Sequence, residues 1–318
     1  MKKYRLAILG AGDISNFHYD AFIKAGFSID HCASKKNSER AKIFADKHNI
    51  KKCYSEPFEQ IENHEKWDMI LLAIDTNYNH LYLKKIIETG KLCLVEKPVF
   101  TNLSSFDDID FSKHTKVRVA YNRRYYKSIQ RAKLFIEDNS PVTCKVELPE
   151  SIDFKLNDKF NPVLLNSVHG IDSLLYLFRN LKIINNTKIN SPDGRISILK
   201  NKNGDIIILI MNWNSPSNFS FNFEGKGKRL EVKPLEFSKL FMGMDIIEPT
   251  EDIRIRRFFP KEVEEISSFP DSNNEIKPGL YEQALEMKSI LDGKEPTISA
   301  SLFDALEVQK LTHQILGI

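Results

Sequence analysis

The first twenty-five residues constrain the fold most, because they join a short apolar run to a glycine turn and a helical pattern. Residues 4–9 (Tyr-Arg-Leu-Ala-Ile-Leu) have the length and apolar character of a buried parallel strand. Gly10-Ala11-Gly12 follows directly. Apolar residues then recur at helical spacing, at Ile14, Phe17, Ala21 and Ala25. The segment therefore predicts a strand, a tight turn and a helix, in that order.

The glycine turn has the chemistry of a dinucleotide site. Gly10 permits a tight turn, and Gly12 lets the backbone approach phosphates without an intervening side chain, at a helix N-terminus that offers unpaired N–H groups. The third glycine of the dinucleotide fingerprint is replaced by Ser15, a mild departure because serine is small. Such a turn can also be a plain strand-to-helix connection. Its place after the first strand favours a cofactor site, formed by Gly10, Gly12, Asp13 and Ile14.

Strand-like and helix-like segments alternate up to about residue 121. The expected strands are 28–33, 68–74, 92–95 and 116–121, and the expected helices include 38–48 and 79–89. This alternation is the mark of a parallel sheet with helices on both faces. The sequence therefore predicts the α/β class, with a doubly wound Rossmann domain over residues 1–121.

Beyond residue 140 the pattern changes to strands without regular intervening helices, which predicts a second, largely antiparallel α/β domain over residues 122–318. The expected strands are 142–148, 195–199, 205–213, 219–223 and 228–232. Asn203-Gly204 between two apolar runs predicts a hairpin. Two helices follow at 280–291 and 302–316, where Ser301 and Asp304 resemble a capping box, and these helices could pack back on the first domain.

Composition argues against several classes of protein. The chain has 46 basic and 43 acidic residues, and the lysines are scattered, which gives a nucleic-acid surface little support. The four cysteines show no Cys-x-x-Cys spacing and predict reduced thiols in a cytoplasmic protein. No window is apolar enough for a signal peptide or a membrane span. We therefore expect a small-molecule partner, with no nucleic acid, membrane or metal.

Glu96-Lys97-Pro98 follows the expected strand at 92–95. Because the ring of Pro98 fixes the local backbone, we expect the Lys97 ammonium at the carboxyl edge of the sheet, where ligands bind in such folds. There it could hydrogen-bond a reacting oxygen and stabilise the charge that develops during hydride transfer. The plainer alternative is a lysine at the end of a strand that is simply solvated.

A helix near residue 170 carries a polar face and an apolar face. At 100° per residue, the apolar side consists of Ile171, Leu174, Leu175 and Phe178. Asn166, His169 and Asp172 fall within an arc of about 120° on the other side, and we expect them to face away from the core. His169 could exchange the hydroxyl proton at neutral pH, and Asp172 could orient its ring or bind a substrate hydroxyl. Such a face is also often only water-exposed.

The end of the second strand bears on the choice of cofactor. A carboxylate there would bind the ribose 2′-hydroxyl of NAD, but the chain reads Ala-Ser-Lys-Lys at 33–36. Ser34 and Lys35 suit a 2′-phosphate better, while Asp30 lies in mid-strand. The sequence thus favours NADP over NAD, unless the lysine pair only solubilises a loop.

Four segments together resemble the Gfo/Idh/MocA oxidoreductases, the family of glucose-fructose oxidoreductase and inositol dehydrogenase. They are the first-strand Gly-x-Gly, Leu-Cys-Leu-Val-Glu-Lys-Pro at 92–98, Val-Ala-Tyr-Asn-Arg-Arg at 119–124, and Asn-Ser-Val-His-Gly-Ile-Asp-Ser-Leu-Leu-Tyr-Leu-Phe at 166–178. The resemblance covers essentially the full length and is strongest in the first 180 residues. It implies a Rossmann domain, a C-terminal domain on a large open sheet, a nicotinamide ring near Lys97, a sugar-like substrate, and a homodimer or homotetramer.

The resemblance also implies roles for individual residues. Further cofactor contacts would come from Asp75, Thr76, Asn77, His80 and Glu96. His169 would be the acid-base residue. Many members place an aspartate four residues before this histidine, where this chain has Leu165; Asn166 resembles a smaller subgroup and would contact substrate.

Residues 122–127 (Asn-Arg-Arg-Tyr-Tyr-Lys) mark the passage between the expected domains. Arg124 could bind an anionic substrate such as a sugar nucleotide, because arginine forks recognise phosphate well, or it could form an interdomain salt bridge.

The favoured function is an NAD(P)-dependent oxidoreductase that transfers a hydride between nicotinamide and a hydroxyl or keto carbon of a sugar, cyclitol or sugar nucleotide. Lys97 and His169 would handle the oxygen and its proton. Two alternatives stay open: an NAD-dependent glycoside-cleaving enzyme of the same family type, and a non-enzymatic regulator that senses a dinucleotide.

Overall fold

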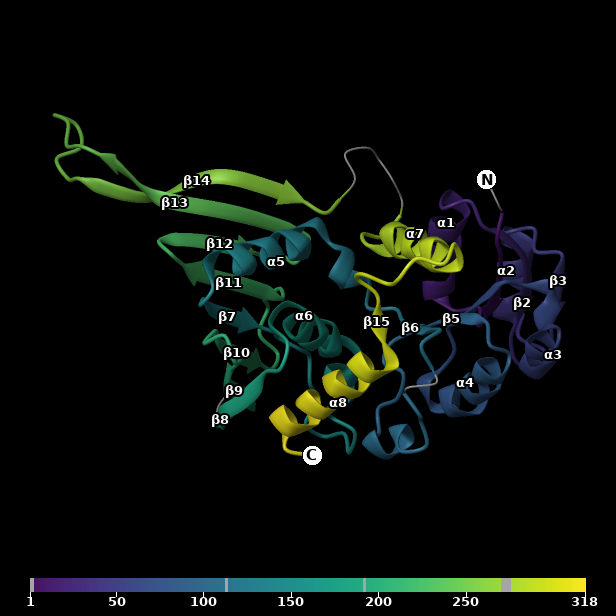
Figure 1. The fold of residues 1–318 in the computed structure, drawn as a ribbon. Coiled ribbons are helices and arrows are strands. Elements are labelled where there is room, and N and C mark those ends of the chain that lie inside the picture. Colours follow the sequence, from purple (N-terminus) through teal and green to yellow (C-terminus); the bar gives the residue numbers. More distant parts are fainter. Residues whose placement is uncertain (1–2, 112–113, 191–192, 270–275) are drawn as a thin grey trace. The chain divides into compact units, whose positions relative to one another are not determined.

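The computed structural model describes residues 3–111, 114–190, 193–269 and 276–318 (Figure 1). The chain divides into two compact units. Unit 1 consists of Met1–Tyr125 and Ser272–His313, and unit 2 of Tyr126–Asp271 and Gln314–Ile318. Unit 1 is therefore built from two segments that are far apart in the sequence.

Unit 1 contains a seven-stranded sheet among the described residues, in the order β15-β6-β5-β4-β1-β2-β3. Its strands are β1 (Arg5–Leu9), β2 (Ser28–Ala33), β3 (Lys52–Tyr54), β4 (Met69–Leu72), β5 (Leu92–Val95), β6 (Val117–Val119) and β15 (Ala300–Ser301). β1 to β6 are parallel, and β15 joins the edge in the antiparallel direction. The prediction of an α/β fold with a mostly parallel Rossmann sheet is confirmed.

The helices of this part of the chain are α1 (Asp13–Lys24), α2 (Glu39–Lys47), α3 (Pro57–Glu62), α4 (Asn79–Glu88), α7 (Leu280–Leu291) and α8 (Leu302–Leu316), with short 3-10 turns at His64–Lys66, Thr76–Tyr78, Leu103–Phe106 and Asn122–Tyr125. The predicted bounds of α7 and α8 are confirmed. The predicted capping box is confirmed too, since Ser301 N donates to the Asp304 carboxylate at 2.7 Å and Asp304 N donates to Ser301 Oγ at 3.1 Å.

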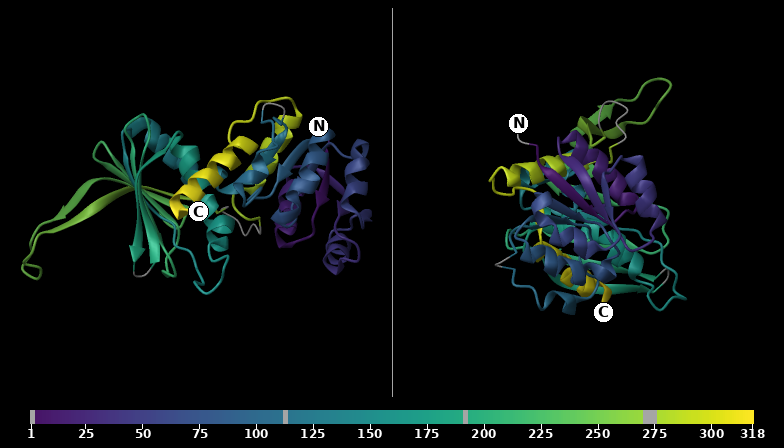
Figure 2. Two further views of the ribbon diagram at one scale, coloured as in Figure 1. Left: turned by 90° about the horizontal axis from the view of Figure 1, so that it is seen from below. Right: turned by 90° about the vertical axis from the view of Figure 1, so that its right-hand side faces the viewer.

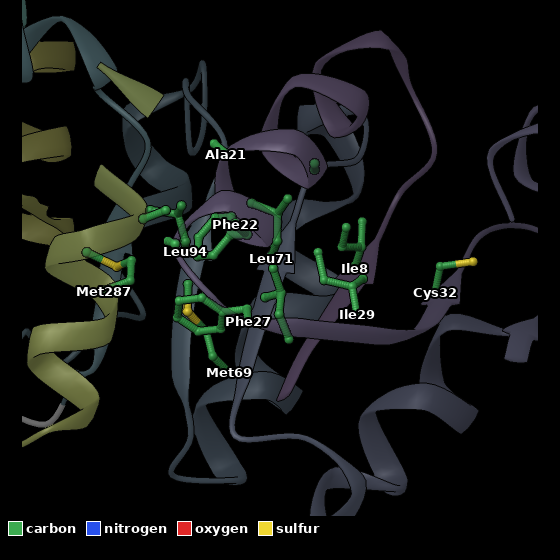
Figure 3. Close-up of a cluster of buried hydrophobic side chains, with 14 of the residues drawn as sticks. Ile8, Ala21, Phe22, Phe27, Ile29, Cys32, Met69, Leu71, Leu94 and Met287 are labelled. Atoms are coloured by element: carbon green, nitrogen blue, oxygen red, sulfur yellow. The ribbon is translucent and has the colours of Figure 1, made fainter. Parts of the chain in front are cut away.

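The core of unit 1 lies between the sheet, α1 and α7 (Figure 3). Phe22 of α1 meets Phe27 edge to face at 4.9 Å, and both are almost fully buried. α7 adds Leu280, Ala284 and Met287 to the same cluster. A segment from near the C-terminus thus completes a core that the first hundred residues begin.

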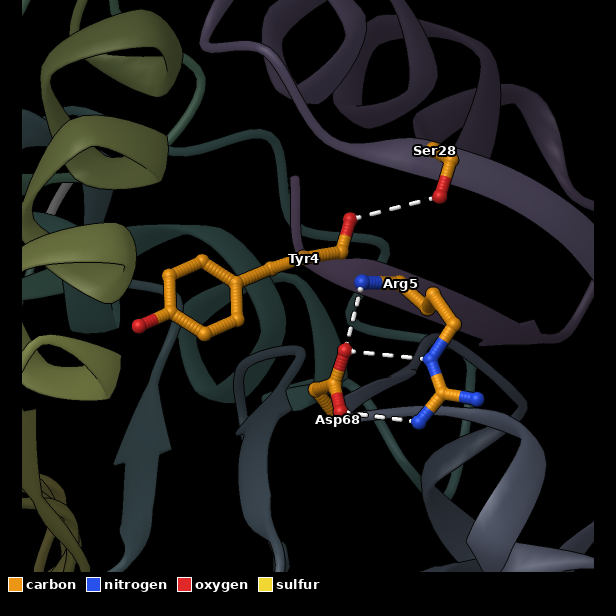
Figure 4. A network of polar contacts seen from close by, with 4 residues as sticks. All are labelled: Tyr4, Arg5, Ser28 and Asp68. Atoms are coloured by element: carbon orange, nitrogen blue, oxygen red, sulfur yellow. Dashed lines mark hydrogen bonds and ion pairs between the residues drawn. The ribbon is translucent and has the colours of Figure 1, made fainter. Parts of the chain in front are cut away.

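Polar contacts hold the start of β1 in place (Figure 4). Arg5 donates from its backbone N to the Asp68 carboxylate at 2.9 Å and from its guanidinium at 2.9 and 3.2 Å. Ser28 N donates to the Tyr4 carbonyl at 2.8 Å. The Tyr4 hydroxyl lies 2.7 Å from the Asp292 carboxylate, just after α7. These bonds connect the start of β1 to β2, to Asp68 just before β4, and to Asp292 just after α7.

Unit 2 contains an eight-stranded sheet within the described ranges, in the order β14-β13-β12-β11-β7-β10-β9-β8. Its strands are β7 (Thr143–Glu147), β8 (Lys182–Asn190), β9 (Asp193–Lys200), β10 (Ile206–Asn212), β11 (Ser220–Gly225), β12 (Lys228–Val232), β13 (Phe237–Ile247) and β14 (Arg257–Ser267). Neighbouring strands are antiparallel except β7 and β10, which are parallel. The predicted second sheet, mostly antiparallel, is confirmed.

Two helices, α5 (Lys127–Asn139) and α6 (Val168–Phe178), cover the same face of this sheet. Phe135 of α5 and Phe178 of α6 both approach Phe223 of β11, at 6.3 and 6.2 Å between ring centroids. The predicted hairpin at Asn203-Gly204 is confirmed, because β9 and β10 pair on either side of it and Gly204 has a φ of 89°.

Three strands of this sheet were not predicted, namely β8, β13 and β14. β13 and β14 extend well beyond the other strands as a long hairpin (Figures 1 and 2). Every residue from Met242 to Ile247 is exposed, so neither face of this part is buried within the chain. We name residues 242–262 the arm.

Candidate functional site

A pocket of about 1040 Å³ opens in unit 1 where β1, β2 and β4 end. It is lined by Gly10, Ala11, Gly12, Ser34, Lys35, Asn37, Ser38, Glu39, Arg40, Pro57, Ala73, Ile74, Asp75, Tyr78 and Tyr82. β4 and β2 flank β1 on opposite sides, so the pocket lies at the point where the strand order reverses. In open α/β sheets, ligands bind outside the carboxyl ends of the strands at this point.

The two glycines of the turn are needed for different reasons. Gly10 has a φ of 113°, and a Cβ at this position would lie 2.0 Å from the Ala73 carbonyl oxygen, so the β1–β4 contact requires glycine. Gly12 is the N-cap of α1, and no atom lies within 4 Å of the position that its Cβ would occupy. The space beside Gly12 is therefore open to a ligand at the helix N-terminus.

The serine that replaces the third fingerprint glycine is buried, and its hydroxyl donates to the Gly10 carbonyl at 3.2 Å. Ser15 thus stabilises the turn. Asp13 and Ile14, which we expected at the cofactor, are not among the residues that line the pocket.

The rim of the pocket beyond β2 carries two cations, Lys35 and Arg40, and one carboxylate, Glu39. Ser34 and Lys35 line it as expected, and the exposed Arg40 at the start of α2 joins them. Ser38 caps α2 by accepting from Ala41 N at 3.3 Å. Sequence reasoning missed Arg40, because its place depends on how the loop turns into α2.

The residues that follow β4 differ in whether they line the pocket. Asp75 lines the pocket, and its carboxylate accepts a hydrogen bond from Asn77 N at 3.0 Å. Thr76 donates its hydroxyl to the Pro98 carbonyl at 3.3 Å. Asn77 and His80 are exposed and do not line the pocket. Tyr78 and Tyr82 line the pocket instead, and neither residue was predicted.

Glu96 connects α1 to the backbone of Lys97. His18, whose side chain is fully buried, lies with Nε2 2.6 Å from Glu96 Oε1. Because the carboxylate can only accept, His18 donates from Nε2. The other oxygen, Oε2, accepts from Lys97 N at 3.1 Å, and the Lys97–Pro98 peptide is cis. Sequence reasoning missed His18; the signal available was its helical spacing with the core residue Phe22.

In unit 2, the predicted polar face near residue 170 is only partly present. His169 is 6% exposed and Asp172 is fully buried, so these two residues do not form the water-exposed face that was the alternative interpretation. Asn166 is exposed and lies in a π-helical turn, Val163–Ser167, before α6. That turn breaks the regular 100° spacing on which the prediction relied. The Asn166 amide donates to the Glu150 carboxylate at 2.9 Å.

Arg124 is engaged within unit 1. Its side chain is 5% exposed, its guanidinium lies 3.6 Å from the Asp304 carboxylate, and it donates to the Ile298 carbonyl at 3.3 Å. The neighbouring Tyr125 hydroxyl contacts the Glu286 carboxylate. Burial, and then the negative charge of Glu286, raise the pKa of Tyr125 well above its ordinary value. These contacts attach residues 122–125 to the C-terminal segment of unit 1.

One known family resembles the Rossmann part of this chain. Residues 4–122 match the family model described as "Oxidoreductase family, NAD-binding Rossmann fold". The match covers the Rossmann part of the chain, from the start of β1 to beyond the end of β6. Over these residues, the match confirms the predicted resemblance to the Gfo/Idh/MocA oxidoreductases. No curated protein sequence matches the chain.

Solved structures share the fold of this chain over nearly its whole length. UDP-N-acetylglucosamine 3-dehydrogenase from Acidithiobacillus ferrooxidans is 13% identical, with a TM-score of 0.74, over 99% of this chain and 97% of that one. A putative NADPH-dependent oxidoreductase from Desulfitobacterium hafniense is 17% identical, with a TM-score of 0.76, over 98% and 94%. Levoglucosan dehydrogenase with NADH and levoglucosan is 15% identical, with a TM-score of 0.74, over 99% and 96%.

The described part of the chain holds no candidate membrane span and no candidate metal site. Within residues 3–111, 114–190, 193–269 and 276–318, every helix is too short or too polar to cross a bilayer. The same ranges hold no cluster of three or more histidine, cysteine, aspartate or glutamate residues that could bind a metal ion.

Proposed function

We propose that the protein is an NADP-dependent dehydrogenase or reductase that interconverts a hydroxyl and a keto carbon of a sugar, cyclitol or sugar nucleotide. The observation that carries the proposal is the pocket at the ends of β1, β2 and β4, where a glycine turn meets the N-terminus of α1 and two cations form the rim. A bound nicotinamide dinucleotide supplies or accepts the hydride. Two proteins of the same fold support the substrate class: one is a UDP-N-acetylglucosamine 3-dehydrogenase, and the other is a levoglucosan dehydrogenase.

The pocket fits the diphosphate of a dinucleotide. The open space beside Gly12 allows close approach to the backbone, and the first turn of α1 offers unpaired N–H groups to negative charge. The absence of a side chain at Gly12 therefore leaves room for the diphosphate, whereas its absence at Gly10 avoids a clash with the Ala73 carbonyl.

The cations Lys35 and Arg40 favour NADP, because a 2′-phosphate can accept charge-assisted hydrogen bonds from both. A structure of the same fold is named as NADPH-dependent. NAD is the second candidate, because Glu39 lines the same rim and a carboxylate there suits two ribose hydroxyls.

At the reacting carbon, Lys97 would hydrogen-bond the substrate oxygen and stabilise the negative charge that develops there. Glu96 would contribute by holding the Lys97 backbone N–H at 3.1 Å, itself held by His18. His169 would take the hydroxyl proton during oxidation or return it during reduction, with Asp172 as its polar neighbour one turn away. Asn166 and Arg124 remain candidates for contacts with substrate.

The cofactor test is a fluorescence titration with NADPH and NADH. We expect Lys35→Ala with Arg40→Ala to weaken NADPH binding by about tenfold or more and to leave NADH binding nearly unchanged, because only NADPH carries the 2′-phosphate. Lys36→Ala is the matched control, since Lys36 is also exposed but does not line the pocket. Equal losses for both cofactors would contradict the NADP assignment.

The test of the reaction is turnover at the nicotinamide absorbance band, with levoglucosan and UDP-N-acetylglucosamine as the first probes in a wider sugar panel. We expect Lys97→Ala to keep NADPH affinity and to abolish turnover. Lys85→Ala serves as control, because Lys85 only forms an exposed ion pair with Glu88 at 2.8 Å. Undiminished turnover of Lys97→Ala would dismiss the catalytic assignment.

The proposal includes a homodimer or homotetramer in the cytoplasm. Support for self-association comes from the arm, where Met244, Ile246 and Phe258 are each more than half exposed and Ile246 pairs with Phe258 across the hairpin. Free thiols at all four cysteines fit a reducing compartment. Light scattering tests the assembly: we expect Phe258→Glu to lower the measured mass, and a monomeric parent protein would refute this part.

A further inference from the structure

Two cysteines lie side by side at the edge of the first sheet. Cys32 of β2 and Cys53 of β3 are directly paired in the parallel register. Side chains of paired residues point to the same face, and Cα atoms of adjacent strands are about 4.8 Å apart. That separation lies inside the range of roughly 4.4–6.8 Å that a disulfide spans. The pair thus meets the backbone requirement for a covalent bridge.

The two thiols differ in access to solvent. Cys53 is exposed, with Sγ 3.9 Å from the Ala41 carbonyl, whereas Cys32 is fully buried. Burial, and then the neighbouring Cys53, raise the pKa of the Cys32 thiol. An oxidant in solution therefore meets Cys53 first, and Cys32 is the nearest thiol that can react with the product.

We propose that Cys32 and Cys53 are an oxidant-sensitive modification site that forms a reversible disulfide beside the dinucleotide pocket. The oxidant class is a peroxide, and hydrogen peroxide represents it. The Cys53 thiolate attacks one peroxide oxygen, so that an S–O bond forms, the O–O bond breaks and hydroxide leaves. The Cys32 sulfur then attacks the Cys53 sulfenic sulfur, an S–S bond forms, and the oxygen leaves as water with the Cys32 proton. In total, two thiols are oxidised and one peroxide is reduced to two water molecules.

The bridge would act on the pocket through the backbone. Ala33 separates Cys32 from Ser34, which lines the pocket, and Ser34 N donates to the carbonyl of Tyr54, the residue after Cys53, at 3.2 Å. A disulfide holds its Cβ atoms about 3.8 Å apart, roughly 1 Å closer than adjacent strands do. Closing the bridge therefore shifts the strand ends that carry Ser34. We expect dinucleotide affinity to fall several-fold; this consequence alone rests on the proposed function.

The experiment treats the full-length protein with hydrogen peroxide, alkylates the remaining thiols and maps the peptides by mass spectrometry. The expected result is a protein lighter by two hydrogen atoms, with the peptides of Cys32 and Cys53 linked and with the link lost on treatment with dithiothreitol. Cys53→Ser, at an exposed position, should abolish the link. Cys93→Ala should leave it intact, because Cys93 lies in β5, on the other side of β1 and β4. Oxidation of Cys53 to a sulfinic acid while Cys32 stays alkylatable would overturn the proposal.

NADPH titration of the reduced and oxidised protein separates this inference from the proposed function. If the protein with the Cys32–Cys53 disulfide binds NADPH as tightly as the reduced protein, the proposed effect of the disulfide on the pocket is refuted. A reduced protein that binds neither NADPH nor NADH would refute the proposed cofactor site, while the mass spectrum would still decide whether the disulfide forms.

Discussion

Alanine substitutions at the two turn glycines should separate the stability of the fold from cofactor binding. At Gly10 an alanine would combine a φ of 113° with a Cβ 2.0 Å from the Ala73 carbonyl oxygen. Backbone strain of this kind costs about 1–3 kcal/mol, and forced displacement of packed neighbours costs about as much again. We therefore expect Gly10→Ala to lower the free energy of unfolding by roughly 2–6 kcal/mol.

At Gly12 the same substitution should barely affect folding. The backbone has a φ of −80° and a ψ of 178°, which any residue adopts, and no atom lies within 4 Å of the new Cβ. Replacing the glycine N-cap lowers the free energy of unfolding by about 0.5–1 kcal/mol. The lower conformational entropy of the unfolded alanine chain raises it by about as much, so the two effects oppose one another. The methyl group would, however, enter the space beside the α1 N-terminus. We expect NADPH affinity to fall by about tenfold, a loss of roughly 1.4 kcal/mol.

The assay pairs urea unfolding, followed by circular dichroism, with NADPH fluorescence titration of the parent protein and both variants. The expected pattern is one variant that loses stability and one that keeps stability but loses affinity. A Gly12→Ala protein that binds NADPH as the parent does would refute the phosphate site beside α1. A Gly10→Ala protein of parental stability would refute the close contact between the turn and β4.

Two further substitutions test the polar contacts of unit 1. His18→Leu removes the 2.6 Å hydrogen bond to the Glu96 carboxylate, and we expect the free energy of unfolding to drop by about 1.5–3 kcal/mol in urea; a change below about 0.5 kcal/mol would contradict this. Arg5→Gln tests the pH dependence of stability, because the hydrogen bond from Arg5 lowers the pKa of Asp68. A lowered carboxylate pKa stabilises the fold above the unfolded-state value of about 3.9 and ceases to do so as the pH falls through the lower folded-state value. The stability difference between parent and variant should therefore shrink below about pH 4 in acid titrations, and a pH-independent difference would rule out this origin.

Local pattern predicted the elements whose side chains are buried on a regular period. The strand at 92–95 was predicted with its observed bounds, because apolar residues fill it and all four are buried. The strand at 28–33 was also predicted with its observed bounds, although only Ile29, Cys32 and Ala33 are buried in it. The two C-terminal helices were also predicted with their observed bounds, and the Ser301–Asp304 capping box is present. The pocket residues Gly10, Gly12, Ser34 and Lys35 followed from the rule that ligands bind at the carboxyl ends of parallel strands, whereas Asp75 followed from the family resemblance.

The features that were missed depend on contacts that a local window does not contain. β8 is rich in asparagine, and the arm is exposed on both faces, so neither shows the alternation that marks a strand. The π-helical turn at Val163–Ser167 displaced Asn166 from the face expected for it. The His18–Glu96 contact joins residues 78 positions apart, and no spacing rule relates them.

The position of α7 has a consequence for biosynthesis. Phe22, Phe27 and the strands around them leave the ribosome early, but the hydrophobic cluster that they form also requires Leu280, Ala284 and Met287. Lys288 adds a hydrogen bond to the Ala25 carbonyl at 3.0 Å. During translation, one apolar surface of the nascent Rossmann sheet therefore stays uncovered until α7 has been synthesised. More than half of the polypeptide is made in that interval. Chaperones that shield apolar surfaces would therefore have access to this surface before α7 covers it.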